Sequence, residues 1–97
     1  MATFVTLINW TDQGIRNYKD SMKRAQAFSD MVGGMGGKVK DIYWTIGPYD
    51  IVAIVDAPDD ETATAAALQV GSLGNVRTTT LRGFNRSEFE AIIKKTG

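Results

Sequence analysis

The sequence predicts an α+β fold, in which strands and helices follow one another in the order β-α-β-β-α-β and a short helix ends the chain. Three observations predict this class. Four short segments are rich in β-branched and aromatic residues. Two longer segments carry apolar residues every three to four positions, which is the spacing of amphipathic helices. Glycine, proline and aspartate separate these segments at the points where the chain must turn.

Four strands are expected, at residues 3–10, 38–46, 49–56 and 76–81. The first and third are apolar almost throughout, whereas the second alternates and the fourth is rich in threonine. Gly47-Pro48 forms the turn between the second and third strands, because proline has a fixed φ and no N–H for a ladder hydrogen bond.

Three helices are expected around these strands. The first runs for about five turns over residues 15–32 and is ended by the glycines that follow. The second begins at a cap supplied by Asp59 or Asp60, and its alanine-rich face can lie close to a sheet. The last has the Ser-x-x-Glu form of a capping box at residues 87–90.

Two split β-α-β units joined by a tight hairpin predict a ferredoxin-like fold, built as one domain over residues 1–97. Right-handed crossovers place the first and third strands at the centre of an antiparallel sheet. The same rule places both long helices on one face of that sheet. The other face has no helix of its own except the short one at the end.

This second face needs a cover. Both faces of both central strands are apolar, whereas an antiparallel sheet with one wet face alternates apolar with polar residues. A homodimer or higher homo-oligomer with sheets packed face to face supplies the cover, and a monomer capped by its own C-terminal helix is the alternative. The residues expected at the subunit contact are Phe4, Ile8, Trp10, Trp44, Val52 and Ile54.

Composition excludes several classes of function. Eleven basic and eleven acidic residues cancel and are scattered, so neither nucleic acid nor a membrane is an expected partner. Cysteine and histidine are absent, which removes disulfides, thiolate chemistry, Cys/His metal sites and histidine catalysis. We expect no metal ion and no cofactor. Without a signal peptide or a long apolar run, the cytoplasm is the expected location.

Three motifs in order resemble the GYD-domain family. They are Gly-Pro-Tyr-Asp at 47–50 before an apolar strand, Asp-Ala-Pro-Asp-Asp-Glu at 56–61, and Leu-Gly-Asn-Val-Arg-Thr-Thr-Thr-Leu-Arg at 73–82 followed by Phe84. The resemblance covers nearly the whole chain. It implies a dimeric α+β barrel type of ferredoxin-like domain, and it implies almost nothing about chemistry.

Tyr49 and Asp50 have two interpretations. In the structural one, Asp50 accepts backbone N–H bonds at the hairpin and Tyr49 packs beside the turn. In the functional one, Tyr49 donates a hydrogen bond to a ligand and Asp50 acts as acceptor or base. Adjacent residues on a strand point to opposite faces, which favours the structural interpretation.

Other polar and aromatic side chains are candidates for a ligand site. A cavity beneath the first helix is expected around Tyr18 and Met22, beside Tyr43 on the second strand. Arg77 could clamp an anion, although Arg82 falls on the opposite face of a regular strand. The candidate ligand-binding residues are Tyr49, Asp50, Tyr43, Tyr18 and Arg77.

Three functions remain open at this point. The first is a self-associating domain that binds a small organic ligand between its sheet and helices. The second is a small cofactor-free enzyme of the dimeric α+β barrel type, an oxygenase or isomerase. The third is a pure assembly module. The absence of histidine and of a suitably spaced carboxylate pair favours binding or assembly over catalysis.

Overall fold

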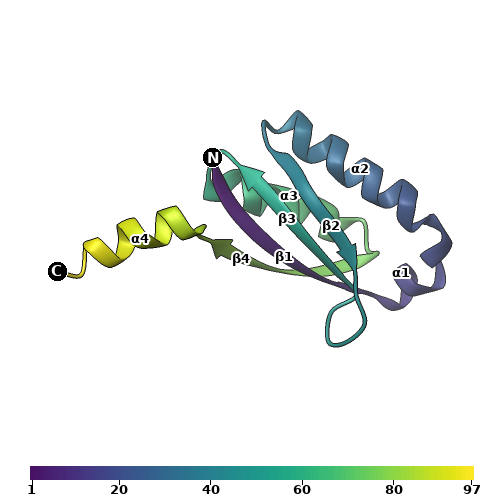
Figure 1. Cartoon of the computed structure of the whole chain (residues 1–97). Coiled ribbons are helices and arrows are strands. Elements are labelled where there is room, and N and C mark those ends of the chain that lie inside the picture. The colour runs from purple at the N-terminus through teal and green to yellow at the C-terminus, as the bar shows by residue number, and fades with distance from the viewer.

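The computed structural model describes residues 1–97 and contains a single four-stranded antiparallel sheet (Figure 1). Its strands are β1 (Ala2–Trp10), β2 (Lys38–Trp44), β3 (Ile51–Ala57) and β4 (Val76–Gly83). The order across the sheet is β2-β3-β1-β4, so the first and third strands are central, as predicted. This order is compatible with a ferredoxin-like arrangement.

The long helices α2 (Ser21–Gly34) and α3 (Asp60–Ser72) lie over one face of the sheet (Figure 1). The buried core sits between that face and these helices, and comprises Ile8, Val32, Ile51, Ala53, Val55 and Ala66. The last helix, α4 (Arg86–Lys94), projects away from the body (Figure 1). It therefore leaves the other face of the sheet, here called the open face, uncovered.

The first helical region differs from the single long helix that the sequence predicts. It divides into α1 (Asp12–Arg16), a 3-10 turn η1 (Tyr18–Asp20) and α2. The break lies at Asn17, whose backbone leaves the helical region at φ −108° and ψ 31° while its N–H still donates to the Gly14 carbonyl. The 3-10 turn changes the angle at which side chains leave the axis, so the expected apolar stripe does not continue across it.

Gly14 is required by a close approach between α1 and the loop before β4. A Cβ atom at this position would lie 1.9 Å from the carbonyl oxygen of Asn75. The same oxygen accepts a hydrogen bond from the N–H of Thr11 at 3.0 Å. Thr11 also caps α1, because its hydroxyl accepts from the Gly14 N–H at 3.1 Å. Only glycine lets the two segments meet at this distance.

The strand register corrects the expected subunit contact. Phe4 pairs with Val55 and Ile8 pairs with Ile51, and all four are buried under the helices within one chain. Alternation in strands that are apolar on both faces does not reveal which set of side chains meets the helices. The prediction therefore chose the wrong face of β1, since Phe4 and Ile8 lie on the face that the helices cover.

Two tryptophans of the expected contact are also on the helix-covered face. Trp10 pairs with Val76 and packs against the core, and Trp44 pairs with Ile51 at the edge of the sheet. Of the six residues expected at a subunit contact, only Val52 and Ile54 lie on the open face.

Helix α4 begins at a capping box that lies two residues earlier than predicted. Asn85, not Ser87, has the extended backbone of an N-cap, and its side chain accepts from the Glu88 N–H at 2.8 Å. The Glu88 carboxylate accepts from the Asn85 N–H at 2.9 Å, which completes the box.

Candidate functional site

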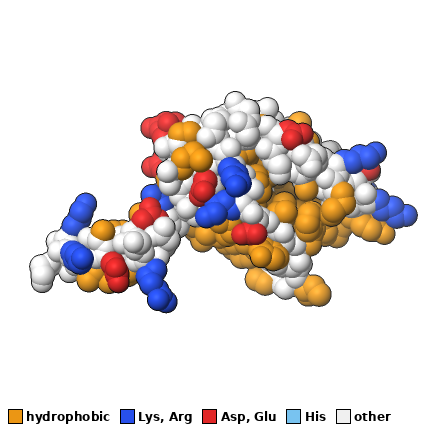
Figure 2. Space-filling view, turned by 45° about the horizontal axis from the view of Figure 1, so that its top comes forward, with side chains coloured by type: hydrophobic (Ala, Val, Ile, Leu, Met, Phe, Trp, Pro, Cys, Tyr) orange, Lys and Arg blue, Asp and Glu red, His pale blue; other side chains and the backbone are white.

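The open face of the sheet has an apolar centre that spans three strands. Val5 and Leu7 of β1 lie beside Ile54 and Val52 of β3, and Leu81 of β4 lies on the other side of Val5. The four central side chains are half-buried by their neighbours in the sheet, and Leu81 is 48% exposed. We call these five residues the apolar patch. Figure 2 shows a broad apolar area over the body of the molecule and separate apolar groups on the projecting helix.

Polar side chains surround the apolar patch. At one end, Thr3 donates its hydroxyl to the Asp56 carboxylate at 2.9 Å, and Lys40 from the β2 bulge approaches the same carboxylate at 3.9 Å. At the other end, Asn9 pairs with Arg77. An apolar centre with a polar rim is the usual anatomy of a protein–protein interface. The open face is therefore the leading candidate for a functional surface.

Tyr43 extends this surface at the β2 edge. It pairs with Val52 on the open face and is 59% exposed. Arg77 is also exposed on the open face but lies on β4, the opposite edge strand. The two central strands separate these candidates, so they do not form one small-molecule site.

Asp50 has structural contacts at the hairpin. Its carboxylate accepts from the Trp10 backbone N–H at 2.9 Å, and its own N–H donates to the Ile8 carbonyl at 2.9 Å. Its carbonyl accepts from the Thr45 N–H at 2.8 Å, while the Thr45 hydroxyl donates to the Tyr49 carbonyl. These bonds fasten the end of β1 to the β2–β3 hairpin, which is the structural interpretation of this motif.

The cavity expected around Tyr18 and Met22 is absent from that place. Tyr18, in η1, is 55% exposed, and Met22, at the start of α2, is 62% exposed. Tyr18 is thus apart from the hairpin residues Tyr49 and Asp50, and Tyr43 and Arg77 lie on opposite edge strands. The five expected ligand-binding residues therefore do not meet at one place.

Arg82 anchors the chain where it leaves the sheet for α4. It pairs with Phe4, on the face opposite to that of Arg77, as the spacing of the two arginines predicts. Its guanidinium lies 4.4 Å from the Phe84 ring centroid and approaches Glu88 at 4.0 Å. Arg82 therefore has structural partners on its own chain. Asp56 is not one of them, because its carboxylate pairs with Lys40.

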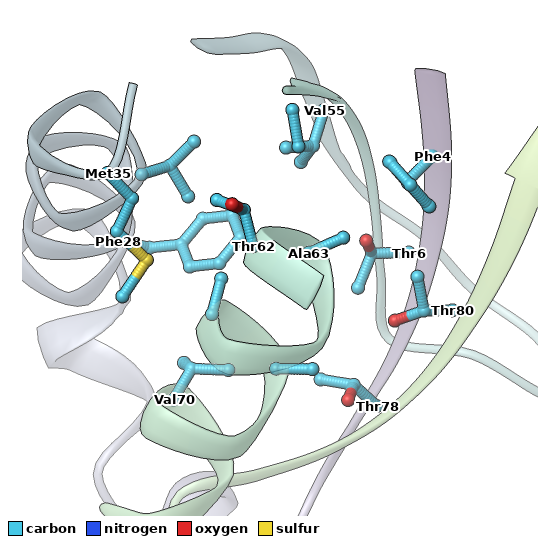
Figure 3. Close-up of a pocket in the computed structure, with 14 residues that line it drawn as sticks. Phe4, Thr6, Phe28, Met35, Val55, Thr62, Ala63, Val70, Thr78 and Thr80 are labelled. Carbon is cyan, nitrogen blue, oxygen red and sulfur yellow. The ribbon is translucent and has the colours of Figure 1, made fainter. Parts of the chain in front are cut away.

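Two neighbouring cavities do lie between α2, α3 and the sheet, beneath the first long helix as the sequence predicts, but they are lined by other residues than the expected ones. The smaller has a volume of about 20 Å³, and Figure 3 shows its lining, with Phe28 and Val70 on the helices and Thr78 and Thr80 on β4. The larger, about 270 Å³, is lined by residues that include Trp10, Phe28 and Val70. Apolar spacing along the sequence does not encode which side chains of the two helices line these cavities.

No group of three or more acidic side chains is gathered where it could hold a metal ion. None of the helices combines the length and the apolar character needed to cross a membrane.

The sheet, its two covering helices and its bare face define a small α+β protein with a one-sided antiparallel sheet. The chain belongs to the GYD-domain family, whose model matches residues 4–93. A protein of Thermus thermophilus named "glutamine synthetase and cystathionine beta-lyase binding protein" is 32% identical over 95 residues. The match covers 97% of this chain and 100% of that protein.

Two solved structures resemble this fold. The crystal structure of the protein TTHA0845 from Thermus thermophilus has a TM-score of 0.57 and 31% identity, over 88% of this chain and 95% of that one. The leucine response regulatory protein LrpA of Mycobacterium tuberculosis has a TM-score of 0.65 and 17% identity, over 87% of this chain and 51% of that one. The second likeness concerns the fold alone.

Proposed function

We propose that this chain is an accessory protein that associates with itself through its open face and binds other proteins, without catalysing a reaction. The observation that carries the proposal is the apolar patch, which no element of the chain covers. Soluble proteins that expose a large contiguous apolar area usually use it for association.

A second copy of the chain is the best cover for the apolar patch. Two sheets packed face to face interdigitate their side chains, and a two-fold axis lets the same patch serve both partners. The alternative cover, α4 of the same chain, extends away from the sheet (Figure 1). The result is a homodimer in which the Asp56 and Arg77 ends of the open face form part of a polar rim.

Helix α4 contributes to the same association. Its apolar side chains Phe89 and Ile93 are exposed, and the helix projects past the end of β4, away from the body (Figure 1). An amphipathic helix gains stability mainly by packing its apolar face against another element. We assign that element to the partner copy, because the direction of α4 leads away from its own sheet.

A class of further partner is suggested by the name of the Thermus relative, which says that it binds glutamine synthetase and cystathionine beta-lyase. We propose that this chain also binds metabolic enzymes, and that these two are the first to test. We propose the cytoplasm as the location of this chain on the same ground.

The test compares Leu7→Asp with Leu68→Asp. Leu7 belongs to the apolar patch, whereas Leu68 is exposed on α3, so the same charge is added to two different surfaces. Light scattering should give a dimer for the wild type and Leu68→Asp, and a monomer for Leu7→Asp. A Leu7→Asp protein that remains dimeric would contradict the proposed contact.

Partner binding is tested separately by surface plasmon resonance, with purified glutamine synthetase and cystathionine beta-lyase passed over the immobilised wild-type chain. Saturable binding of either enzyme, absent with serum albumin, supports the accessory role. If neither enzyme binds, the proposal that they are partners is wrong. Self-association is tested independently by light scattering.

A further inference from the structure

The larger cavity lies on the helix-covered side of the sheet, away from the open face. Its volume of about 270 Å³ is close to the lower end of the size range of organic ligand sites, about 300 Å³. Eleven of its fifteen lining residues are hydrophobic, including Ile8 and Ile51 from the sheet and Met31 from α2. Phe28 and Val70 also line the smaller cavity and separate the two spaces. The smaller one has room for about one water molecule.

Trp10 lines the larger cavity and carries an unpaired hydrogen-bond donor. Its indole Nε1 is buried and has no hydrogen-bond partner, and it is the only buried side-chain nitrogen or oxygen in this condition. Its backbone is held by the Asp50 carboxylate at 2.9 Å, which fixes the residue at the end of β1. A buried N–H without a partner is costly, so an acceptor from outside the chain that reaches this donor would gain a hydrogen bond.

Arg24 gives the same cavity a positive charge. Its guanidinium donates to the Asn17 and Gly14 carbonyls, both at 3.1 Å, which positions the group and leaves further N–H donors available. It has no carboxylate within 4.0 Å, and no aspartate or glutamate lines the cavity. The charge of the lining therefore favours an anion.

We infer that this cavity binds a small apolar carboxylate, such as a short fatty acid or an aromatic acid. The hydrocarbon part occupies the apolar walls, and the carboxylate accepts a hydrogen bond from the Trp10 indole in a cavity made positive by Arg24. A carboxylate satisfies the donor and matches the charge, whereas an alcohol of the same length does only the first. This binding does not depend on the open face, which lies on the other side of the sheet.

The chain has two tryptophans, which makes a direct test possible. In a nitrogen-15 labelled sample, two indole N–H signals are expected, and Trp44→Phe assigns them. Hexanoate, octanoate, benzoate and phenylacetate are titrated in turn, with 1-hexanol, 1-octanol and benzyl alcohol as neutral controls. At least one carboxylate should move the Trp10 indole signal in a saturable manner, while the Trp44 signal stays in place.

Three variants locate the site. Trp10→Phe keeps an aromatic ring but removes the donor, and should weaken carboxylate binding about tenfold. Arg24→Gln should lower the ratio of carboxylate affinity to alcohol affinity. A loss of fold stability would weaken both ligands and leave this ratio unchanged. Ala25→Phe fills the cavity from α2 and should abolish binding, with the remaining amide spectrum reporting that the protein is folded.

Several outcomes would overturn the inference. If no carboxylate in the panel moves the Trp10 signal, the cavity is not such a site. Equal affinities for the alcohols and the carboxylates would show that the site does not select a carboxylate. An unchanged response in a folded Ala25→Phe protein would show that binding occurs outside this cavity. Leu7→Asp should retain the response, which separates this result from a failure of the proposed self-association.

Discussion

At the residue scale, a few side chains and one glycine fix how the segments meet. The Asp50 carboxylate ties the Trp10 backbone to the hairpin, and Gly14 lets α1 approach the Asn75 carbonyl. Both contacts join segments that are distant in sequence. Their loss should affect the stability of the whole domain, because small domains unfold cooperatively.

Asp50→Ala should lower the free energy of unfolding by about 1–3 kcal/mol, since it leaves the Trp10 N–H without its charged acceptor. Tyr49→Phe is the control at the adjacent position and should change it little, because the hydrogen bond at Tyr49 uses the backbone carbonyl. Urea unfolding measures both. Equal stability of Asp50→Ala and the wild type would argue against the structural role of this carboxylate.

Gly14→Ala should lower the free energy of unfolding by about 1–3 kcal/mol, the usual range for an overpacked contact. The added Cβ would meet the Asn75 oxygen at 1.9 Å, so α1 or the loop must shift. Gly71→Ala in α3 is the matched control, because nothing lies within 4 Å of its Cβ. That change should be neutral or stabilise by up to about 1 kcal/mol. A tolerated Gly14→Ala would mean that the approach is looser than the structure shows.

At the element scale, the sequence predicts the strands and their order because each signal is local or follows from handedness. The caps were partly predictable: Asp59 caps α3 as expected, whereas Asn85 takes the place of Ser87 at α4. The break at Asn17 was missed, because the apolar residues keep a helical spacing in the sequence on both sides of it, although the helix itself is interrupted there. Tyr18 and Met22, which follow that break, are exposed to solvent.

The cap of α3 gives a pH-dependent prediction. Hydrogen bonds from Thr62 hold the pKa of the Asp59 carboxyl below its ordinary value of 3.8. A carboxyl whose pKa is lower in the folded state stabilises the fold above the unfolded pKa, and this contribution disappears as pH falls through the folded pKa. Asp59→Ala should therefore have a lower Tm than the wild type at neutral pH.

The Tm difference between Asp59→Ala and the wild type should shrink as pH falls below about 3.8. Asp59→Asn is the control, because asparagine caps helices well without titrating. Calorimetry across this pH range measures all three proteins. A difference that stays constant with pH would show that the charge of Asp59 has no part in the cap.

The apolar face of α4 gives a second prediction for an element. Phe89→Asp should weaken self-association, and it should leave the stability of the monomer unchanged because this side chain is exposed within one chain. Ala91→Asp is the control on the same helix, outside the apolar face. Sedimentation velocity compares the variants. Equal dimerisation of both would remove α4 from the contact.

At the scale of the whole molecule, the sheet has more apolar surface than the two helices α2 and α3 cover. The sequence indicates this excess, because both faces of β1 and β3 are apolar. It does not indicate which side chains form each face, so Phe4 and Ile8 were expected at the contact that Val5 and Leu7 occupy in our proposal. The register between strands supplies that information.

The most direct test of self-association is the mass of the wild-type protein by sedimentation equilibrium over a dilution series. We predict a species of twice 10.6 kDa, with monomer appearing only on dilution. A single species of 10.6 kDa at every concentration would contradict this prediction, since the apolar patch would then remain uncovered in solution.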